Sequence, residues 1–175
     1  MLPAMPPTTP PTGPAVRLRP VAEADVADVL ALNAAEVEML APMDGPRLHE
    51  LRGSAHRFDV VDVDGAFGGF VVTFAPGAAY DSENYRWFSR RSGSGDDFYY
   101  LDRFVLHEAQ RRRGIGGRVY DELEAVAAAY GRMVLEVNLV PRNEASLAFH
   151  ARRGYVEVGQ LGDPAHLVSL MEKPL

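Results

Sequence analysis

The sequence predicts an α/β protein in which helices flank a mixed, mostly antiparallel sheet. Two strand patterns, at residues 58–63 and 67–74, are joined by the turn dipeptide Asp64–Gly65, which predicts a hairpin. Further along the chain, a helical pattern over residues 114–130 lies between two more strand patterns. This strand–helix–strand order predicts a parallel crossover inside a sheet that otherwise runs through hairpins.

The predicted strands share period-two alternation or a high content of β-branched and aromatic residues. They span residues 16–19, 58–63, 67–74, 98–106, 133–140, about 155–160 and about 166–172. A first helix starts near Glu23 and Asp25, where negative charge is favourable, and extends to about Leu40.

Two later helices are expected, and each is followed by a glycine that can end it. Residues 114–130 precede Gly131, and residues 143–152 precede Gly154. Residues 41–57 contain two prolines and two glycines and have no assignment, whereas residues 75–97 are expected to form a long connection.

The N-terminal segment differs in composition from the rest of the chain. Six of the 13 prolines lie within residues 1–14, which carry no charge. We expect a disordered, proline-rich tail over residues 1–14, or a ligand for a proline-binding domain, and a single domain over residues 15–175. The segment lacks the basic start and apolar run of a signal peptide, so we expect a cytoplasmic protein.

Composition excludes several classes of function. The 175 residues include 18 Lys+Arg and 24 Asp+Glu, for a net charge of −6, and there is no cysteine. Neither a disulfide scaffold nor a thiolate nucleophile or metal ligand is available, and we expect no metal site. The acidic balance argues against a nucleic-acid partner, and no segment predicts membrane insertion.

The stretch with the clearest chemistry joins the strand at 98–106 to the following helix. It reads Arg111-Arg112-Arg113-Gly114-Ile115-Gly116-Gly117. Free backbone N–H groups at a helix start, flexible glycines and basic side chains together suit a phosphate or pyrophosphate. A P-loop is excluded because no lysine follows the glycines, and the third glycine of a dinucleotide fingerprint is missing. A solvated arginine face with a simple turn is the alternative interpretation.

This stretch and a second one downstream resemble the GNAT superfamily of acyl-CoA-dependent N-acetyltransferases. The family pattern Arg/Gln-x-x-Gly-x-Gly/Ala corresponds to residues 111–116. The later pattern corresponds to Leu135-Glu136-Val137, followed by Asn143, Ser146, Phe149-His150 and Gly154-Tyr155. The resemblance covers residues 16–173 and implies the GNAT-like fold, with strands splayed at the cofactor site.

The resemblance implies that the cofactor is acetyl-CoA, released as coenzyme A. Main-chain groups of Phe104, Val105 and Leu106 would pair with its pantetheine arm as an added strand does. Amides of Arg111, Arg112, Arg113, Gly114, Ile115, Gly116 and Gly117 would hold the pyrophosphate. The remaining contacts would come from Asn143, Ser146, Phe149 and His150.

Transfer to an amine needs a base, an oxyanion donor and an acid for the leaving thiolate. We expect the donor to be a backbone N–H near Val105. The family's tyrosine is replaced by His150, which is a candidate acid or only a cofactor contact. Tyr155 is an alternative donor, although its place after Gly154 is more typical of a core aromatic residue. Candidate bases are Asp102, expected on the same strand face as Phe104, and Glu136; either residue could instead be salt-bridged.

Seven of the 16 aromatic residues lie between residues 80 and 100, interleaved with carboxylates. We expect an acceptor site there for a cationic amine with an apolar portion, a small molecule or a peptide. Its candidate residues are Tyr80, Tyr85, Trp87 and Tyr100. Alternatively, these side chains cover the sheet or an oligomer interface, and a homodimer is consistent with the pattern.

Two functions from different classes follow. The first is an N-acetyltransferase that works by direct attack of the amine on acetyl-CoA in a ternary complex. The second, suggested by the histidine at position 150, is a CoA-binding sensor or interaction module with little or no turnover.

Overall fold

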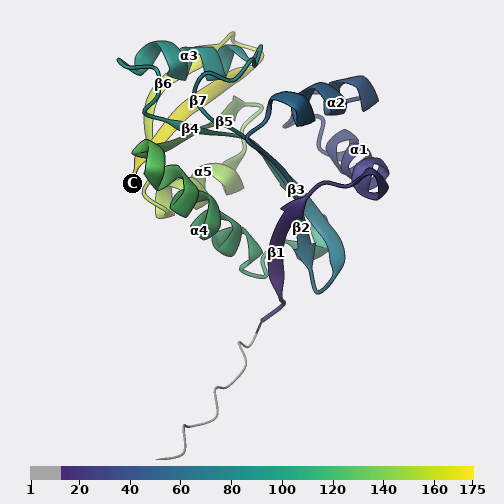
Figure 1. Cartoon of the computed structure of the whole chain (residues 1–175). Coiled ribbons are helices and arrows are strands. Elements are labelled where there is room, and N and C mark those ends of the chain that lie inside the picture. Colours follow the sequence, from purple (N-terminus) through teal and green to yellow (C-terminus); the bar gives the residue numbers. More distant parts are fainter. Residues whose placement is uncertain (1–12) are drawn as a thin grey trace, which may run out of the picture.

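A computed structural model describes residues 13–175, and within this range seven strands form one mixed sheet (Figure 1). The strands are β1 (Val16–Pro20), β2 (Arg57–Val63), β3 (Ala66–Phe74), β4 (Tyr99–Leu106), β5 (Arg132–Val140), β6 (Val156–Gly162) and β7 (Leu167–Pro174). Their spatial order is β1-β2-β3-β4-β5-β7-β6, and every neighbouring pair is antiparallel except β4 and β5. The predicted α/β class with a mostly antiparallel sheet is therefore confirmed.

The helices are α1 (Val26–Ala35), α2 (Gly45–Ser54), α3 (Glu83–Arg91), α4 (Ile115–Ala127) and α5 (Glu144–Arg152). Single 3-10 turns precede α1 at Glu23–Asp25, follow β4 at Glu108–Gln110 and follow α4 at Ala128–Tyr130. The first helix therefore ends five residues before Leu40, where it had been expected to end, and the helix expected over residues 114–130 finishes with a 3-10 turn.

Two hydrophobic cores lie on opposite faces of the sheet. The first core packs α1, α2 and α3 against one face, and Val29, Leu51 and Phe88 are among its fully buried side chains. The second core packs α4 and α5 against the other face, through Val119, Leu123 and neighbouring residues. Figure 1 shows α4 crossing one side of the sheet, with α1 and α2 on the opposite side.

Helix α2 lies within residues 41–57, for which the sequence predicts no element. The Asp44 side chain accepts a hydrogen bond from the Arg47 N–H across 2.9 Å, and a proline lies in the first turn. Asp at the N-cap with Pro just inside the helix is a favourable start. Leu48 and Leu51 then face the first core.

Helix α3 lies inside the segment expected to be a long connection, so that expectation was wrong. Ser82 caps the helix by accepting from the Tyr85 N–H. Tyr85 and Phe88 are buried in the first core, and Trp87 packs against β6, where a side chain at Gly159 would meet its ring at 2.6 Å.

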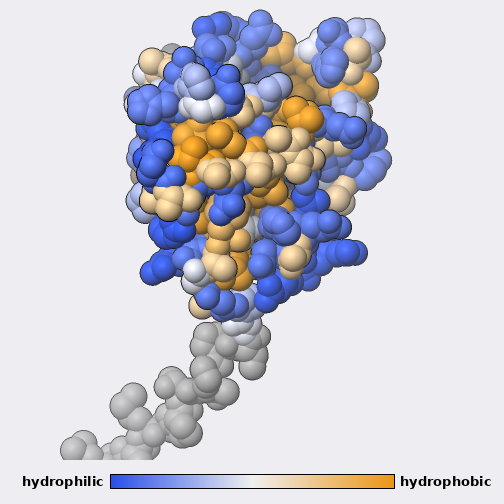
Figure 2. Space-filling view, turned by 90° about the vertical axis from the view of Figure 1, so that its right-hand side faces the viewer, coloured by the Kyte–Doolittle hydropathy of each residue, from blue (hydrophilic) through white to orange (hydrophobic). Residues whose placement is uncertain are grey.

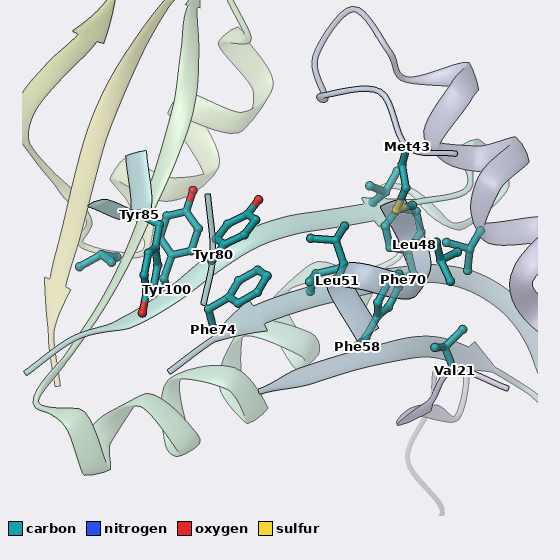
Figure 3. Close-up of a cluster of buried hydrophobic side chains, with 14 of the residues drawn as sticks. Val21, Met43, Leu48, Leu51, Phe58, Phe70, Phe74, Tyr80, Tyr85 and Tyr100 are labelled. Carbon is teal, nitrogen blue, oxygen red and sulfur yellow. The ribbon is translucent and has the colours of Figure 1, made fainter. Parts of the chain in front are cut away.

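The aromatic side chains of residues 74–100 form a connected cluster within the first core, except Tyr99, which lies in the second core. Figure 3 shows Tyr80, Tyr85 and Tyr100 gathered around Phe74. The Phe74 and Tyr80 rings are stacked with centroids 3.9 Å apart, and Tyr85 lies edge-on to Tyr100 at 5.6 Å. Most of this cluster therefore covers the sheet, as the alternative interpretation held.

Strands β4 and β5 pair only over a short stretch. Residues 99–101 pair with residues 133–135, and beyond these positions the two strands diverge. The expectation of splayed strands is confirmed, and the gap lies at the centre of the sheet. No helix in the described part of the chain is long and apolar enough to cross a membrane.

The expected proline-rich tail lies mostly outside the described residues. At its end, the Pro14 carbonyl accepts a hydrogen bond from Arg118 of α4, and the Ala15 N–H donates to Asp64. Pro14 is thus attached to the domain. Figure 2 shows the face that carries α1 and α2, where apolar side chains are framed by hydrophilic ones.

Candidate active site

A cavity of about 420 Å³ lies where β4 and β5 diverge. On the first-core side it is bounded by the turn after α1, by Arg47 of α2 and by Tyr80 and the residues that lead into α3. On the second-core side it is bounded by Tyr120 of α4 and by Ser146 and His150 of α5. Because its walls come from both faces, the cavity connects the two sides of the sheet.

A β-bulge in β4 decides which way its polar side chains point. Arg103 pairs with Val72 and Leu101 pairs with Thr73, so Asp102 is the extra residue. An extra residue interrupts period-two alternation. Asp102 bonds Tyr80 on the first-core side, whereas Phe104 packs in the second core. The expectation that Asp102 and Phe104 share a strand face was therefore wrong.

Two side chains bind the Asp102 carboxylate. Its carboxylate accepts from the Tyr80 hydroxyl and, across 3.0 Å, from Arg103 Nε. The buried Arg103 also donates to the Asn33 side chain at 2.7 Å and to the Ala41 carbonyl at 2.8 Å. This arginine therefore joins the bulge of β4 to α1 and to the turn that bounds the cavity.

Glu136 on β5 is the second carboxylate in the cavity wall, on the same side as Asp102. The Tyr100 hydroxyl donates to its Oε2 across 2.7 Å. Burial, reinforced by the negative charge of Asp102, raises the pKa of Glu136 to about 8. Part of the Glu136 population is therefore ionised near neutral pH, and that ionised form can accept a proton from a neighbouring amine.

The register of β4 against β3 determines which of its backbone groups are free. The His107 N–H donates to the Gly68 carbonyl, and alternation along the ladder turns Val105 towards β3 as well. Phe104 and Leu106 therefore direct their N–H and C=O groups towards the gap. In agreement, the Leu106 carbonyl accepts from Arg111 Nε across 3.1 Å.

The glycine turn leads directly into α4, as the sequence predicted. Gly114 is the N-cap with φ of 76°, and Arg112 also has a positive φ, of 58°. Arg111 contacts Glu36 and Arg113 contacts Gln110. The first amides of α4, at Ile115 to Gly117, have no intrahelical acceptor, which is the arrangement that binds anions.

Helix α5 and its N-cap bring three of the four remaining predicted cofactor residues, Asn143, Ser146 and His150, to the cavity. Asn143 caps the helix by accepting from the Ser146 N–H across 3.1 Å, and both residues line the cavity. Phe149 instead packs in the second core, with its ring centroid 4.9 Å from that of Tyr120.

His150 is buried between two hydrogen bonds. Its Nδ1 lies 2.7 Å from the Ser146 carbonyl and its Nε2 lies 2.6 Å from the Tyr120 hydroxyl. Burial lowers its pKa to about 4, so the imidazole is neutral at pH 7. A role as an imidazolium acid does not fit this environment. Tyr120 was not among the predicted site residues. Its spacing from the apolar residues of the α4 sequence indicates a place in the core and carries no signal of a functional role.

Of the four predicted acceptor residues, only Tyr80 lines the cavity. Inside the first core, the Tyr85 hydroxyl donates to the Ala75 carbonyl and accepts from the Ala78 N–H. Trp87 faces β6, and Tyr100 reaches the site only through its hydroxyl on Glu136. Placing Tyr85 and Trp87 in the acceptor site was therefore wrong, because α3 turns both side chains into the core.

Comparison with family models identifies the chain. The model described as the acetyltransferase (GNAT) family matches residues 30–155, which is more than half of the chain. The protein therefore belongs to the GNAT acetyltransferase family. No curated protein matches the sequence.

Solved structures show the same fold at low sequence identity. Ard1 from Thermoplasma volcanium matches with a TM-score of 0.70 and 18% identity, over 92% of this chain and 98% of that chain. A putative phosphinothricin N-acetyltransferase gives 0.67 and 15%, over 92% and 99%. Arabidopsis thaliana Naa50 in complex with a bisubstrate analogue, CoA-Ac-MVNAL, gives 0.66 and 13%, over 91% and 99%.

The site fits the cofactor of this family, acetyl-CoA. The free amides at the start of α4 suit its pyrophosphate, and the gap-facing groups of Phe104 and Leu106 suit its pantetheine arm. The protein is accordingly an acyl-CoA-dependent acetyltransferase by family and fold.

Proposed function

We propose that this chain transfers an acetyl group from acetyl-CoA to a primary amine by direct attack in a ternary complex. The observation that carries the proposal is the cavity itself. It has gap-facing β4 amides and Tyr120 on one side and two carboxylates, Asp102 and Glu136, on the other. Acetyl-CoA supplies the acetyl group as an activated thioester.

On the cofactor side, the proposal assigns the pyrophosphate to the amides and arginines of residues 111–117. Phe104 and Leu106 would pair with the pantetheine arm. The oxyanion donor moves from Val105, where it had been expected, to the Phe104 N–H, because the Val105 amide faces β3. Asn143 and Ser146 would contact the arm from α5.

On the acceptor side, Glu136 would take the proton from the attacking amine, directly or through one water. Its pKa of about 8 suits a base near neutral pH. Asp102 is less suited because Tyr80 and Arg103 already bind its carboxylate. In this scheme Asp102 acts through Glu136 by adding negative charge next to it.

The charges around the cavity favour a cationic acceptor. Glu36, Asp81, Asp102 and Glu136 line it, against Arg47 and Arg103. Arg47 and Arg103 are paired with Asp81 and Asp102, and Glu36 is paired with Arg111. Glu136 is the lining carboxylate that has no ion-pair partner among the described residues, so its charge would attract a cationic amine. The names of the structural neighbours include both a small-molecule and a peptide acceptor, so the experiment has to distinguish these two classes.

Incubation of the full chain with acetyl-CoA and a panel of amines tests the proposal. The panel contains diamines, amino acids and short peptides with free N-termini, and a thiol reagent measures CoA release. We expect release with cationic small amines or peptides and an acetylated product by mass spectrometry. Absence of release across the panel would contradict the proposed function.

The second candidate is a CoA-binding module with little turnover, and one observation favours it. His150 stands where the family has tyrosine, and it is neutral and fully hydrogen-bonded. Calorimetric binding of CoA without amine-dependent thiol release would support this alternative.

A further inference from the structure

Tyr120 and His150 form a hydrogen-bonded pair in the cavity wall, although they come from different helices. The Tyr120 hydroxyl lies 2.6 Å from His150 Nε2, and both residues line the cavity. Tyr120 follows Gly116 by four residues, so it extends from the face of α4 that begins at the pyrophosphate turn. Its ring centroid is 5.6 Å from that of Phe104, whose amide faces the gap.

The partners of this pair determine where the protons are. The Ser146 carbonyl, 2.7 Å from His150 Nδ1, can only accept, so Nδ1 carries the proton of the neutral ring. His150 Nε2 is then an acceptor and the Tyr120 hydroxyl is its donor. The Nδ1 proton is held by helix α5, whereas the Tyr120 O–H can rotate about its C–O bond towards the cavity.

We infer that Tyr120, held in place by His150, is the hydrogen-bond donor to the leaving sulfur of acetyl-CoA. This inference rests on the proposed function. It moves the donor from helix α5, where the sequence resemblance had suggested His150, to helix α4. His150 becomes a positioning residue.

The amine nitrogen forms a bond to the acetyl carbon and loses one proton to Glu136. The C–S bond breaks, and its electron pair remains on the sulfur. The Tyr120 O–H turns from His150 Nε2 to this sulfur and stabilises its charge by a hydrogen bond. Water protonates the sulfur as CoA leaves, so Tyr120 keeps its proton throughout.

The first test removes the hydroxyl alone. We expect Tyr120→Phe to lower kcat about tenfold to a hundredfold, as loss of a charge-stabilising donor does, with KM for acetyl-CoA nearly unchanged. Tyr155→Phe is the matched control. Its ring also lies against His150, at 5.3 Å, but its hydroxyl donates to Glu124 outside the cavity. Equal kcat values for Tyr120→Phe and wild type would overturn the inference.

A double variant tests whether a phenol hydroxyl at this place in the cavity is what supports turnover. In the Tyr120→Phe background, His150→Tyr returns a phenol from helix α5, and we expect it to recover most of the lost kcat. Should Tyr120→Phe fail to fold, His150→Phe serves instead. It keeps Tyr120, so a fall in kcat of a hundredfold or more would assign the donor to His150 and overturn the inference.

A binding measurement gives a readout that does not need turnover. The ultraviolet absorbance of the thiolate reports the pKa of the thiol in bound CoA. Loss of the Tyr120 donor should raise that pKa by about one pH unit, while calorimetry shows unchanged CoA affinity. Arg153 and Glu124, the charged groups beside Tyr120, are present in both the wild type and Tyr120→Phe. Their effects on the thiol pKa therefore cancel in the comparison.

The two readouts separate the two proposals. If no amine is acetylated, the proposed function fails, and the thiol titration with CoA alone still tests Tyr120. If amines are acetylated and the thiol pKa is the same in wild type and Tyr120→Phe, only the inference about Tyr120 fails.

Discussion

Glu136 and Asp102 are both carboxylates in one cavity wall, yet their surroundings give them different chemistry. Asp102 is bound by Tyr80 and by the guanidinium of Arg103, which fix the position of its carboxyl group. Glu136 has a tyrosine hydroxyl as its partner, and no arginine or lysine in residues 13–175 forms an ion pair with it. The raised pKa of Glu136, about 8, lets this carboxylate gain and lose a proton near neutral pH.

Turnover should therefore depend on pH through Glu136. A base works only when deprotonated, so kcat should rise with pH through about 8, the pKa of this carboxyl. Glu136→Gln should lower kcat about a hundredfold and remove that rise. Steady-state rates from pH 6 to 9.5, with the amine saturating, check this. An unchanged profile in the variant would show that the rise belongs to the amine instead.

The charge of Asp102 should set the position of that rise. Negative charge beside Glu136 disfavours its ionised form, so Asp102→Asn should move the rise in kcat to lower pH. Asp121→Asn is the control, because this exposed carboxylate pairs with Arg153 away from the cavity. A profile that does not move in Asp102→Asn would mean that burial alone raises the Glu136 pKa.

The places of candidate site residues in the fold were predictable where a local pattern specifies them. Residues 111–117 and Asn143 follow from motifs at the starts of helices. The orientation of Asp102 does not, because period-two alternation assumes a regular strand and the bulge breaks it. The contact between Tyr120 and His150 depends on how α4 and α5 pack together, and no local pattern contains that information.

At the scale of elements, helix capping explains what sequence reasoning missed. Asp44 followed by Gly45 and Pro46 is a good helix start, and so is Ser82 followed by Glu83. In α2, prolines and glycines obscured the apolar spacing. In α3, the density of aromatic residues suggested a binding surface rather than a helix that covers the sheet.

The glycine turn before α4 offers a matched pair of substitutions. Gly114 has a φ of 76°, so Gly114→Ala should destabilise the protein by about 1 kcal/mol. A methyl group at Gly116 would meet the rings of Phe104 and Phe149 at 3.6–3.8 Å, which is ordinary contact. Because alanine also favours helix, Gly116→Ala should be neutral or slightly stabilising.

Urea unfolding of both variants and the wild type measures these differences in the free energy of unfolding. If Gly114→Ala were as stable as Gly116→Ala, the left-handed turn would not be required at that position. The loop would then adopt a different backbone path into α4.

At the scale of the whole molecule, the function depends on one break in the sheet. Five antiparallel strand pairs keep their ladders over most of their length, and the single parallel pair separates after three residues. The break opens a passage between two cores that are otherwise closed. The crossover through α4 predicted that β4 and β5 would be parallel. The length of their pairing does not follow from the crossover, because it depends on the bulge in β4 and on the helices that pack on both faces of the sheet.

Two side chains that line the cavity, Glu136 and His150, change the free energy of unfolding with pH in opposite directions. The pKa of Glu136 is raised in the folded protein, so its contribution is complete below pH 4.5 and is lost as pH rises through about 8. The pKa of His150 is lowered, so its contribution is present above pH 6.5 and is lost as pH falls through about 4. Between pH 4.5 and 6.5 both groups change the free energy of unfolding, with opposite signs, so their effects partly offset each other.

A non-titrating variant isolates the His150 slope. We expect the free energy of unfolding of wild type, relative to His150→Gln, to fall as pH is lowered from 7.5 to 4, by at most about 3 kcal/mol. The reason is that the unfolded imidazole gains a proton that the buried ring excludes. Glu136 is present in both proteins, so its opposite slope cancels. Urea unfolding at several pH values measures the difference, and a constant difference would mean that the ring is hydrated and open to the cavity.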